Sequence, residues 1–173
     1  AASAHFFLDY TLLMNGISTK QMNYIGIKPE DTSTVLKNGI VDAVACWEPF
    51  VYIAQEALGN EVLIVPQDQF YNETFNVLVN KAWASQYNLQ LIALLQALKK
   101  AVEYINTEPE RAQQIVAKLL NHDVKLVQAV WKDLNFSLSL HQSLLTTLEA
   151  EARWAIKRGF VEGTKIPNYL NYL

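Results

Sequence analysis

The chain of 173 residues is long enough for one domain or two small lobes, and 51% of its residues are hydrophobic, which predicts a well-filled core. Its net charge of −3, with no basic run, excludes the usual sequence signature of a nucleic-acid-binding protein. Cys46 is the single cysteine, which excludes an internal disulfide and a cysteine-rich metal site.

The first part of the chain alternates helical segments with short apolar runs. Residues 4–15 are apolar nearly all round and predict a buried helix, with Ser3 as its N-cap and Gly16 just past its end. The apolar runs predict strands at 22–27, 40–46 and 61–65, separated by helices at 30–38 and 48–58. This alternation is typical of a mostly parallel sheet with crossover helices, so the predicted fold class is α/β.

The composition changes near residues 66–75, and residues 66–74 are polar and loop-like. Residues 75–80 predict one more strand, and from residue 82 onward apolar residues recur at helical spacing. We therefore expect two units. The first, 1–72, is an α/β lobe that carries the candidate binding residues, and the second, 73–173, is a hinge strand followed by a mainly helical part of another lobe.

The stretch from Gly39 to Phe50 (GIVDAVACWEPF) is the most informative segment. Trp47 and Glu48 stand where the predicted strand ends and Pro49 opens a helix, and ligands bind at this edge of open α/β sheets. Trp47 can wall a pocket or stack on a flat or cationic ligand, and Glu48 can accept hydrogen bonds from an amine. The alternative is an ordinary corner with a packed tryptophan and a carboxylate favoured by the helix dipole.

The start of the first helix is a second candidate site. Free backbone N–H groups and the helix dipole at Ser3, Ala4 and His5 favour an anion, to which Ser3 adds a hydroxyl and His5 adds charge below neutral pH. The alternative is a plain N-cap with a partly exposed histidine. We expect this helix start and the corner at Trp47 and Glu48 to face each other across one crevice.

No catalytic residue, metal site or cofactor is predicted. The sequence contains no GxSxG, P-loop or HExxH motif, and its carboxylates show no spacing that singles out an acid–base pair. His122 and His141 have no partner at metal-ligand spacing.

Three pieces of the sequence carry a family resemblance: Ala1-Ala2-Ser3-Ala4-His5-Phe6, then Gly39-Ile40-Val41-Asp42-Ala43 with Trp47-Glu48-Pro49, then Asn106-Thr107-Glu108-Pro109-Glu110-Arg111-Ala112. In this order the chain resembles the second half of the periplasmic substrate-binding proteins of ABC importers. Within that group, its motifs most resemble those of the nitrate-, taurine- and aliphatic-sulfonate-binding proteins and of the thiamine-pyrimidine-precursor domains. The resemblance implies a type 2 periplasmic-binding fold with the ligand between two lobes, and a chain that lacks the N-terminal segment of the first lobe.

The resemblance also implies a function. The expected role is the solute-binding, non-enzymatic component of an ABC importer, periplasmic or otherwise extracytoplasmic, or anchored to a membrane through a segment outside this chain. Its partners would be a small polar solute (a sulfonate, nitrate, amine or pyrimidine), the membrane permease, and either a second copy or a partner that supplies the missing lobe. The alternatives are an extracytoplasmic sensor domain with the same fold, or a thiamine-pyrimidine synthesis enzyme, whose cysteine-rich segment this sequence lacks.

Overall fold

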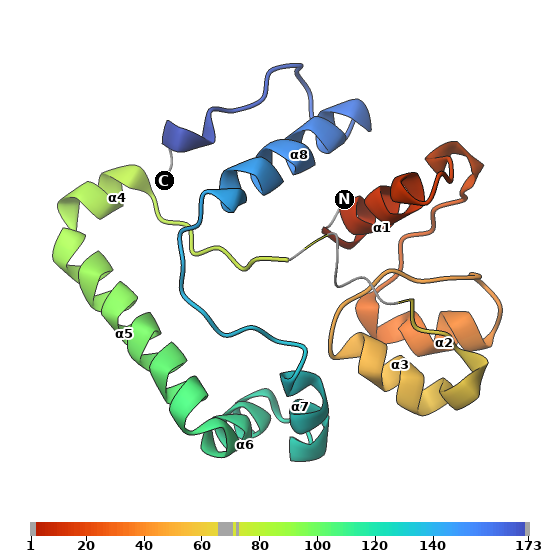
Figure 1. Cartoon of the computed structure of the whole chain (residues 1–173), viewed down its shortest axis with the longest axis horizontal. Coiled ribbons are helices and arrows are strands. Elements are labelled where there is room, and N and C mark those ends of the chain that lie inside the picture. Colours follow the sequence, from red (N-terminus) through yellow and green to blue (C-terminus); the bar gives the residue numbers. More distant parts are fainter. Residues whose placement is uncertain (1–2, 66–70, 72, 172–173) are drawn as a thin grey trace.

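The computed structural model describes residues 3–65, 71 and 73–171, and all regular structure in these ranges is helical (Figure 1). The α-helices are α1 (Ser3–Met14), α2 (Thr32–Lys37), α3 (Phe50–Leu58), α4 (Lys81–Gln86), α5 (Asn88–Thr107), α6 (Pro109–Leu120), α7 (Val124–Trp131) and α8 (Ser143–Lys157). Short 3-10 turns are η1 (Thr19–Gln21), η2 (Pro29–Asp31), η3 (Gly59–Glu61) and η4 (Tyr169–Asn171). Ala1 and Ala2 of the family motif, and most of the predicted loop at 66–74, lie outside the described residues.

The predicted helices are confirmed, and their ends follow the local chemistry. Gly16 and Gly159 follow α1 and α8 with φ of 72°, a left-handed conformation that costs glycine little. The Asn80 side chain accepts the N–H groups of Ala82 and Trp83 at the start of α4. Side-chain oxygens of this kind satisfy helix N–H groups that have no partner within the helix.

The predicted strands at 22–27, 40–46, 61–65 and 75–80 are the main difference from expectation. Apart from Glu61, which ends η3, these stretches in the described residues are neither helical nor paired into a sheet, so the α/β layer is not observed there. An apolar run becomes a strand only when a neighbouring strand takes up its N–H and C=O groups. Within the described part of the chain, the backbone of 63–65 and 75–79 makes no hydrogen bond.

The helices pack as two groups (Figure 1). In one group α1 lies beside α8, and in the other α2 packs on α3, α3 contacts α7, and α7 packs on α6. The buried apolar side chains divide in the same way. Phe6 belongs to the first group, and the second contains Val35, Ala54, Leu58, Ala112, Ala117, Val127 and Val130.

A large apolar surface is left uncovered. The chain exposes 13,426 Å², whereas a compact monomer of this length exposes about 8,600 Å². The most exposed large apolar side chains include Leu63 (88%), Phe75 (88%) and Leu78 (90%), all in the unpaired predicted strands. The described residues include no helix with the length and apolar character needed to span a bilayer.

Candidate functional site

The first turn of α1 presents Ser3 and Ala4, which were predicted to bind ligand. Helix α1 begins at Ser3, and the Ser3 hydroxyl donates a hydrogen bond to the carboxylate of Glu73. This contact brings a residue of the second predicted unit to the helix start. The Ser3 hydroxyl proton is therefore already donated to a carboxylate in this structure.

His5, the third predicted ligand residue on α1, is held by its neighbours. Its Nε2 lies 3.0 Å from Nη2 of Arg158, and its ring centroid lies 4.7 Å from that of Tyr24. Burial lowers the pKa of His5; the carboxylate of Asp9 opposes this shift and the Arg158 guanidinium adds to it. A neutral His5 accepts a hydrogen bond from Arg158, so its environment favours the uncharged imidazole.

Asp9 is the centre of this cluster. It is 2% exposed, and its two oxygens accept hydrogen bonds from the Tyr24 hydroxyl (2.6 Å) and from Nε1 of Trp154 (2.7 Å). Nε of Arg158 lies 3.0 Å from Oδ2 of Asp9 and forms an ion pair with it. A carboxylate in such a buried position is tolerated only when a charge partner and hydrogen-bond donors compensate for lost water. The Asp9 cluster, which we define as Asp9, His5, Tyr24, Trp154 and Arg158, thus fastens α1 to α8.

Sequence reasoning did not single out this cluster. Asp9 is the one acidic residue in α1, whose other residues are mostly apolar. A lone carboxylate on a buried helix needs a partner elsewhere in the chain. That signal was available, but nothing in the sequence identified Trp154 or Arg158 as the partner.

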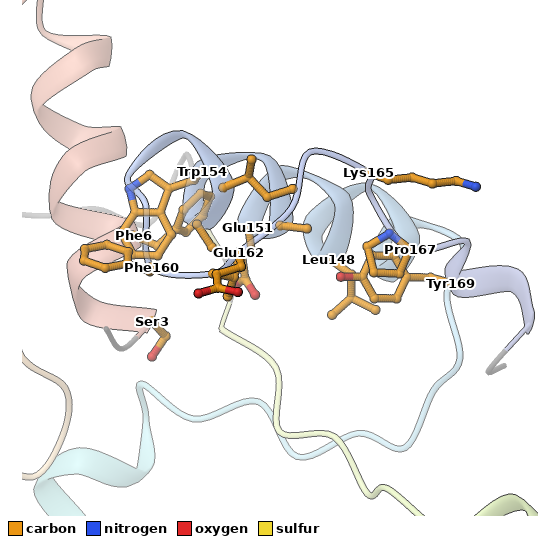
Figure 2. Close-up of a pocket in the computed structure, with 14 residues that line it drawn as sticks. Ser3, Phe6, Leu148, Glu151, Trp154, Phe160, Glu162, Lys165, Pro167 and Tyr169 are labelled. Carbon is orange, nitrogen blue, oxygen red and sulfur yellow. The ribbon is translucent and has the colours of Figure 1, made fainter.

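A cavity of about 720 Å³ opens beside this cluster, between the start of α1, helix α8 and the segment that leads to η4 (Figure 2). Its volume lies within the usual range of small-molecule sites, about 300–1,000 Å³. Ser3 and Phe6 line it from α1, and most of the remaining wall comes from α8 and the residues that follow it. The candidate helix start therefore does border a cavity, whose opposite wall lies in the last part of the chain.

The second candidate site, at Trp47 and Glu48, lies at the start of α3. The Trp47 indole is 39% exposed and packs edge-on against Phe50, with 6.0 Å between ring centroids. Oε2 of Glu48 accepts a hydrogen bond from the N–H of Tyr52 at 3.0 Å, so this carboxylate caps the first turn of α3. Burial raises the pKa of Glu48; the Tyr52 N–H opposes the shift and the charge of Asp133 adds to it.

The two candidate sites have separate surroundings. In the part of the chain that the structure describes, the partners of Ser3 and His5 come from α1, residue 24, residue 73, α8 and the residues just after α8. Those of Trp47 and Glu48 come from the start of α3 and the end of α7. These described residues contain no group of three His, Cys, Asp or Glu side chains arranged to hold a metal ion.

Comparison with known proteins places the chain in a family. A model described as the NMT1-like family matches residues 1–121, well over half of the chain. The chain belongs to the NMT1-like family. This match confirms the resemblance to ABC substrate-binding proteins, and it covers both candidate sites but not α8.

One curated relative of the NMT1-like chain is named "Putative aliphatic sulfonates-binding protein" and comes from Bacillus subtilis (strain 168). The two sequences are 24% identical over 110 residues, which cover 63% of this chain and 33% of the relative. The aligned stretch thus spans about a third of the relative's length. No solved structure matches the chain.

Proposed function

We propose that this chain is part of a solute-binding protein of an ABC importer, which binds a small polar solute and delivers it to a membrane permease. The observation that carries the proposal is the NMT1-like match over residues 1–121, which includes both candidate sites. The curated relative is named for binding aliphatic sulfonates, which supports a binding rather than an enzymatic role. An extracytoplasmic location follows from the same proposal.

We further propose that the complete protein has the α/β periplasmic-binding fold, with units at 1–72 and 73–173. The unpaired apolar stretches support this, because they have the composition of strands and expose backbone groups that a sheet would pair. The chain exposes about 4,800 Å² more than a compact monomer. Obligate interfaces bury about 1,000–2,500 Å² or more per partner, so an excess of this size supports either an added lobe or a second copy as the cover.

The proposed ligand contacts are Ser3, Ala4 and His5 at the start of α1 and Trp47 and Glu48 at the start of α3. Support comes from the cavity that Ser3 lines and from the partly exposed face of Trp47. The proposed solute classes are sulfonates, nitrate, amines and pyrimidines.

The test is a solute screen of the purified chain by isothermal titration calorimetry and thermal shift. A solute at one hundred times its Kd stabilises the folded state by about 2.7 kcal/mol, which thermal shift detects readily. At least one of the four classes of solute is expected to give a binding heat in calorimetry or a rise in Tm in thermal shift. If none of the four classes gives either signal, the proposed solute classes and ligand contacts of this chain are wrong.

A matched pair of variants then localises the site. Trp47→Ala should weaken binding of the solute found in the screen while changing thermal stability little, because the side chain is 39% exposed. Trp83 is equally exposed, lies on α4 and serves as the control, since Trp83→Ala should leave binding unchanged. A loss of stability without a loss of affinity in Trp47→Ala would make Trp47 a packing residue instead.

A further inference from the structure

The cavity beside α1 has an acidic lining. Glu151 and Glu162 contribute their side chains, and both point to the same side of the cavity in Figure 2. Ser3, at the edge of the cavity, donates its hydroxyl to a third carboxylate, that of Glu73. Among the described residues that line the cavity, Lys165 is the only cation, and its ammonium group points away from the two carboxylates (Figure 2).

Among the described residues, neither Glu151 nor Glu162 forms an ion pair with a Lys, Arg or His side chain. Arg158 lies next to the lining residue Trp154, but it is paired with the buried carboxylate of Asp9. The hydroxyl of Tyr71 donates to Glu151 at 2.8 Å and brings no charge. The pKa of Tyr71 is raised by burial, by this hydrogen bond and by the charges of Glu151 and Glu73, which is consistent with a negative potential here.

Aromatic rings supply the other part of the wall. Trp154 lies with its ring centroid 5.5 Å from Phe6 and 5.2 Å from Phe160, and all three line the cavity together with Tyr169. The indole N–H of Trp154 is already taken up by Asp9, so the ring contributes apolar and π surface rather than a donor. Aromatic faces next to carboxylates attract organic cations through the ring quadrupole and through charge.

We propose that the cavity between α1, α8 and the segment leading to η4 binds a small organic cation, a primary or quaternary amine. The ammonium group lies at Glu151 and Glu162, and the hydrocarbon part lies against the aromatic rings. The proposal rests on the proposed solute-binding function and names the class of solute. It also assigns part of the site to α8 and the residues after it, which lie outside the stretch matched by the family.

The same lining disfavours a simple anion. A sulfonate or nitrate in this cavity would lose water next to two carboxylates, and such like-charge pairs repel at short range. The start of α1 provides N–H groups, but its Ser3 hydroxyl is engaged with Glu73. An anionic solute therefore belongs elsewhere in the complete protein, and an amine belongs here.

The experiment titrates the purified chain by calorimetry with tert-butylammonium chloride, with its neutral isostere tert-butanol, and with sodium methanesulfonate. The ammonium probe should bind, should bind more tightly than tert-butanol, and should weaken as salt is added. Glu162→Gln and Glu151→Gln should each reduce its affinity about fivefold. Glu149→Gln is the control because Glu149 is on α8, pairs with Arg153 and does not line the cavity.

Each result decides between distinct conclusions. Equal binding of tert-butylammonium and tert-butanol, or Gln variants that bind the ammonium probe as the wild type does, would overturn the cation proposal. Methanesulfonate binding without ammonium binding would also overturn it and would leave the solute-binding function standing. Glu151→Gln could fold poorly, because the Glu151 carboxylate accepts the Tyr71 hydroxyl. Glu162 has no partner among the described interactions, so Glu162→Gln tests the proposal even in that case.

Discussion

The substitution Asp9→Asn is the most direct test of how α1 is held. The Asp9 carboxylate accepts the Tyr24 hydroxyl on one oxygen, and Trp154 and Arg158 approach the other oxygen. An asparagine has one acceptor and one NH₂ group at these two positions. With the amide oxygen toward Trp154 and Arg158, the NH₂ group faces the Tyr24 hydroxyl, which must turn and accept instead of donate; in the opposite orientation the NH₂ group faces two donors. In both orientations the Arg158 guanidinium loses its anion.

The magnitude follows from burial. Removing one partner of a buried ion pair costs about 3–5 kcal/mol, because the other charge stays desolvated. Asp9 is 2% exposed, but the Arg158 side chain is 27% exposed and recovers some hydration, so the low end of that range, about 3 kcal/mol, is expected. For a chain of this size the loss corresponds to a fall in Tm of roughly 6–12 °C.

The assay is urea unfolding followed by circular dichroism, with calorimetric melting as a second measurement. Asp42→Asn is the control, because Asp42 is exposed, and its free energy of unfolding should stay within about 0.5 kcal/mol of the wild type. A double-mutant cycle with Arg158→Met should show that the two losses are not additive. If Asp9→Asn unfolds at the same urea concentration as the wild type, the Asp9 cluster does not fasten α1 to α8.

Three further predictions concern single side chains. Because the folded-state pKa of His5 lies below its ordinary value of 6.5, the unfolded chain takes up the proton first. Stability should therefore fall as pH drops through about 6.5, less steeply in His5→Gln but unchanged in slope in the exposed control His122→Gln. Glu48→Ala should lower the free energy of unfolding by about 1 kcal/mol, because the cap of α3 is lost. Glu48→Gln should not lower it, because glutamine keeps an acceptor and removes a carboxylate whose pKa is raised by burial. Urea unfolding at pH 7 compares the two variants. Leu78→Ser, at a side chain 90% exposed, should change the free energy of unfolding by less than about 0.5 kcal/mol, whereas Val127→Ala, 5% exposed, should cost about 2 kcal/mol in the same assay.

The sequence predicted the helices because their signals are local. Ser3 and Gly16 mark helix ends through backbone geometry and hydrogen bonding within a few residues, and α1 begins at Ser3 and ends two residues before Gly16. The same holds for Asp123, whose side chain accepts the N–H of Lys125 at 2.8 Å at the start of α7. Local rules of this kind operate whether or not the rest of the fold is present.

The Asp9 cluster could not be predicted in the same way, because its members come from distant parts of the chain. Asp9 and Trp154 are 145 positions apart, and no pattern within either helix indicates the other. The contacts of His5 could not be predicted for the same reason. Its position at a helix start predicts an anion site, and the structure adds a contact at 3.0 Å with Arg158, which follows α8.

The unpaired strands show what a hydrophobic pattern records. Phe75, Val77 and Val79 share one side of the predicted strand, and the other side carries Asn76, Leu78 and Asn80, so one side is wholly apolar and the other mostly polar. In the structure Phe75 is 88% exposed and Val77 is 58% exposed, although nothing in their sequence context favours exposure. The strand-like sequence pattern of these residues and their exposure in the structure are reconciled only if these residues are buried in a protein larger than this chain. The aligned stretch is a third of the curated relative's length, and we propose that a further lobe of the complete protein covers these residues.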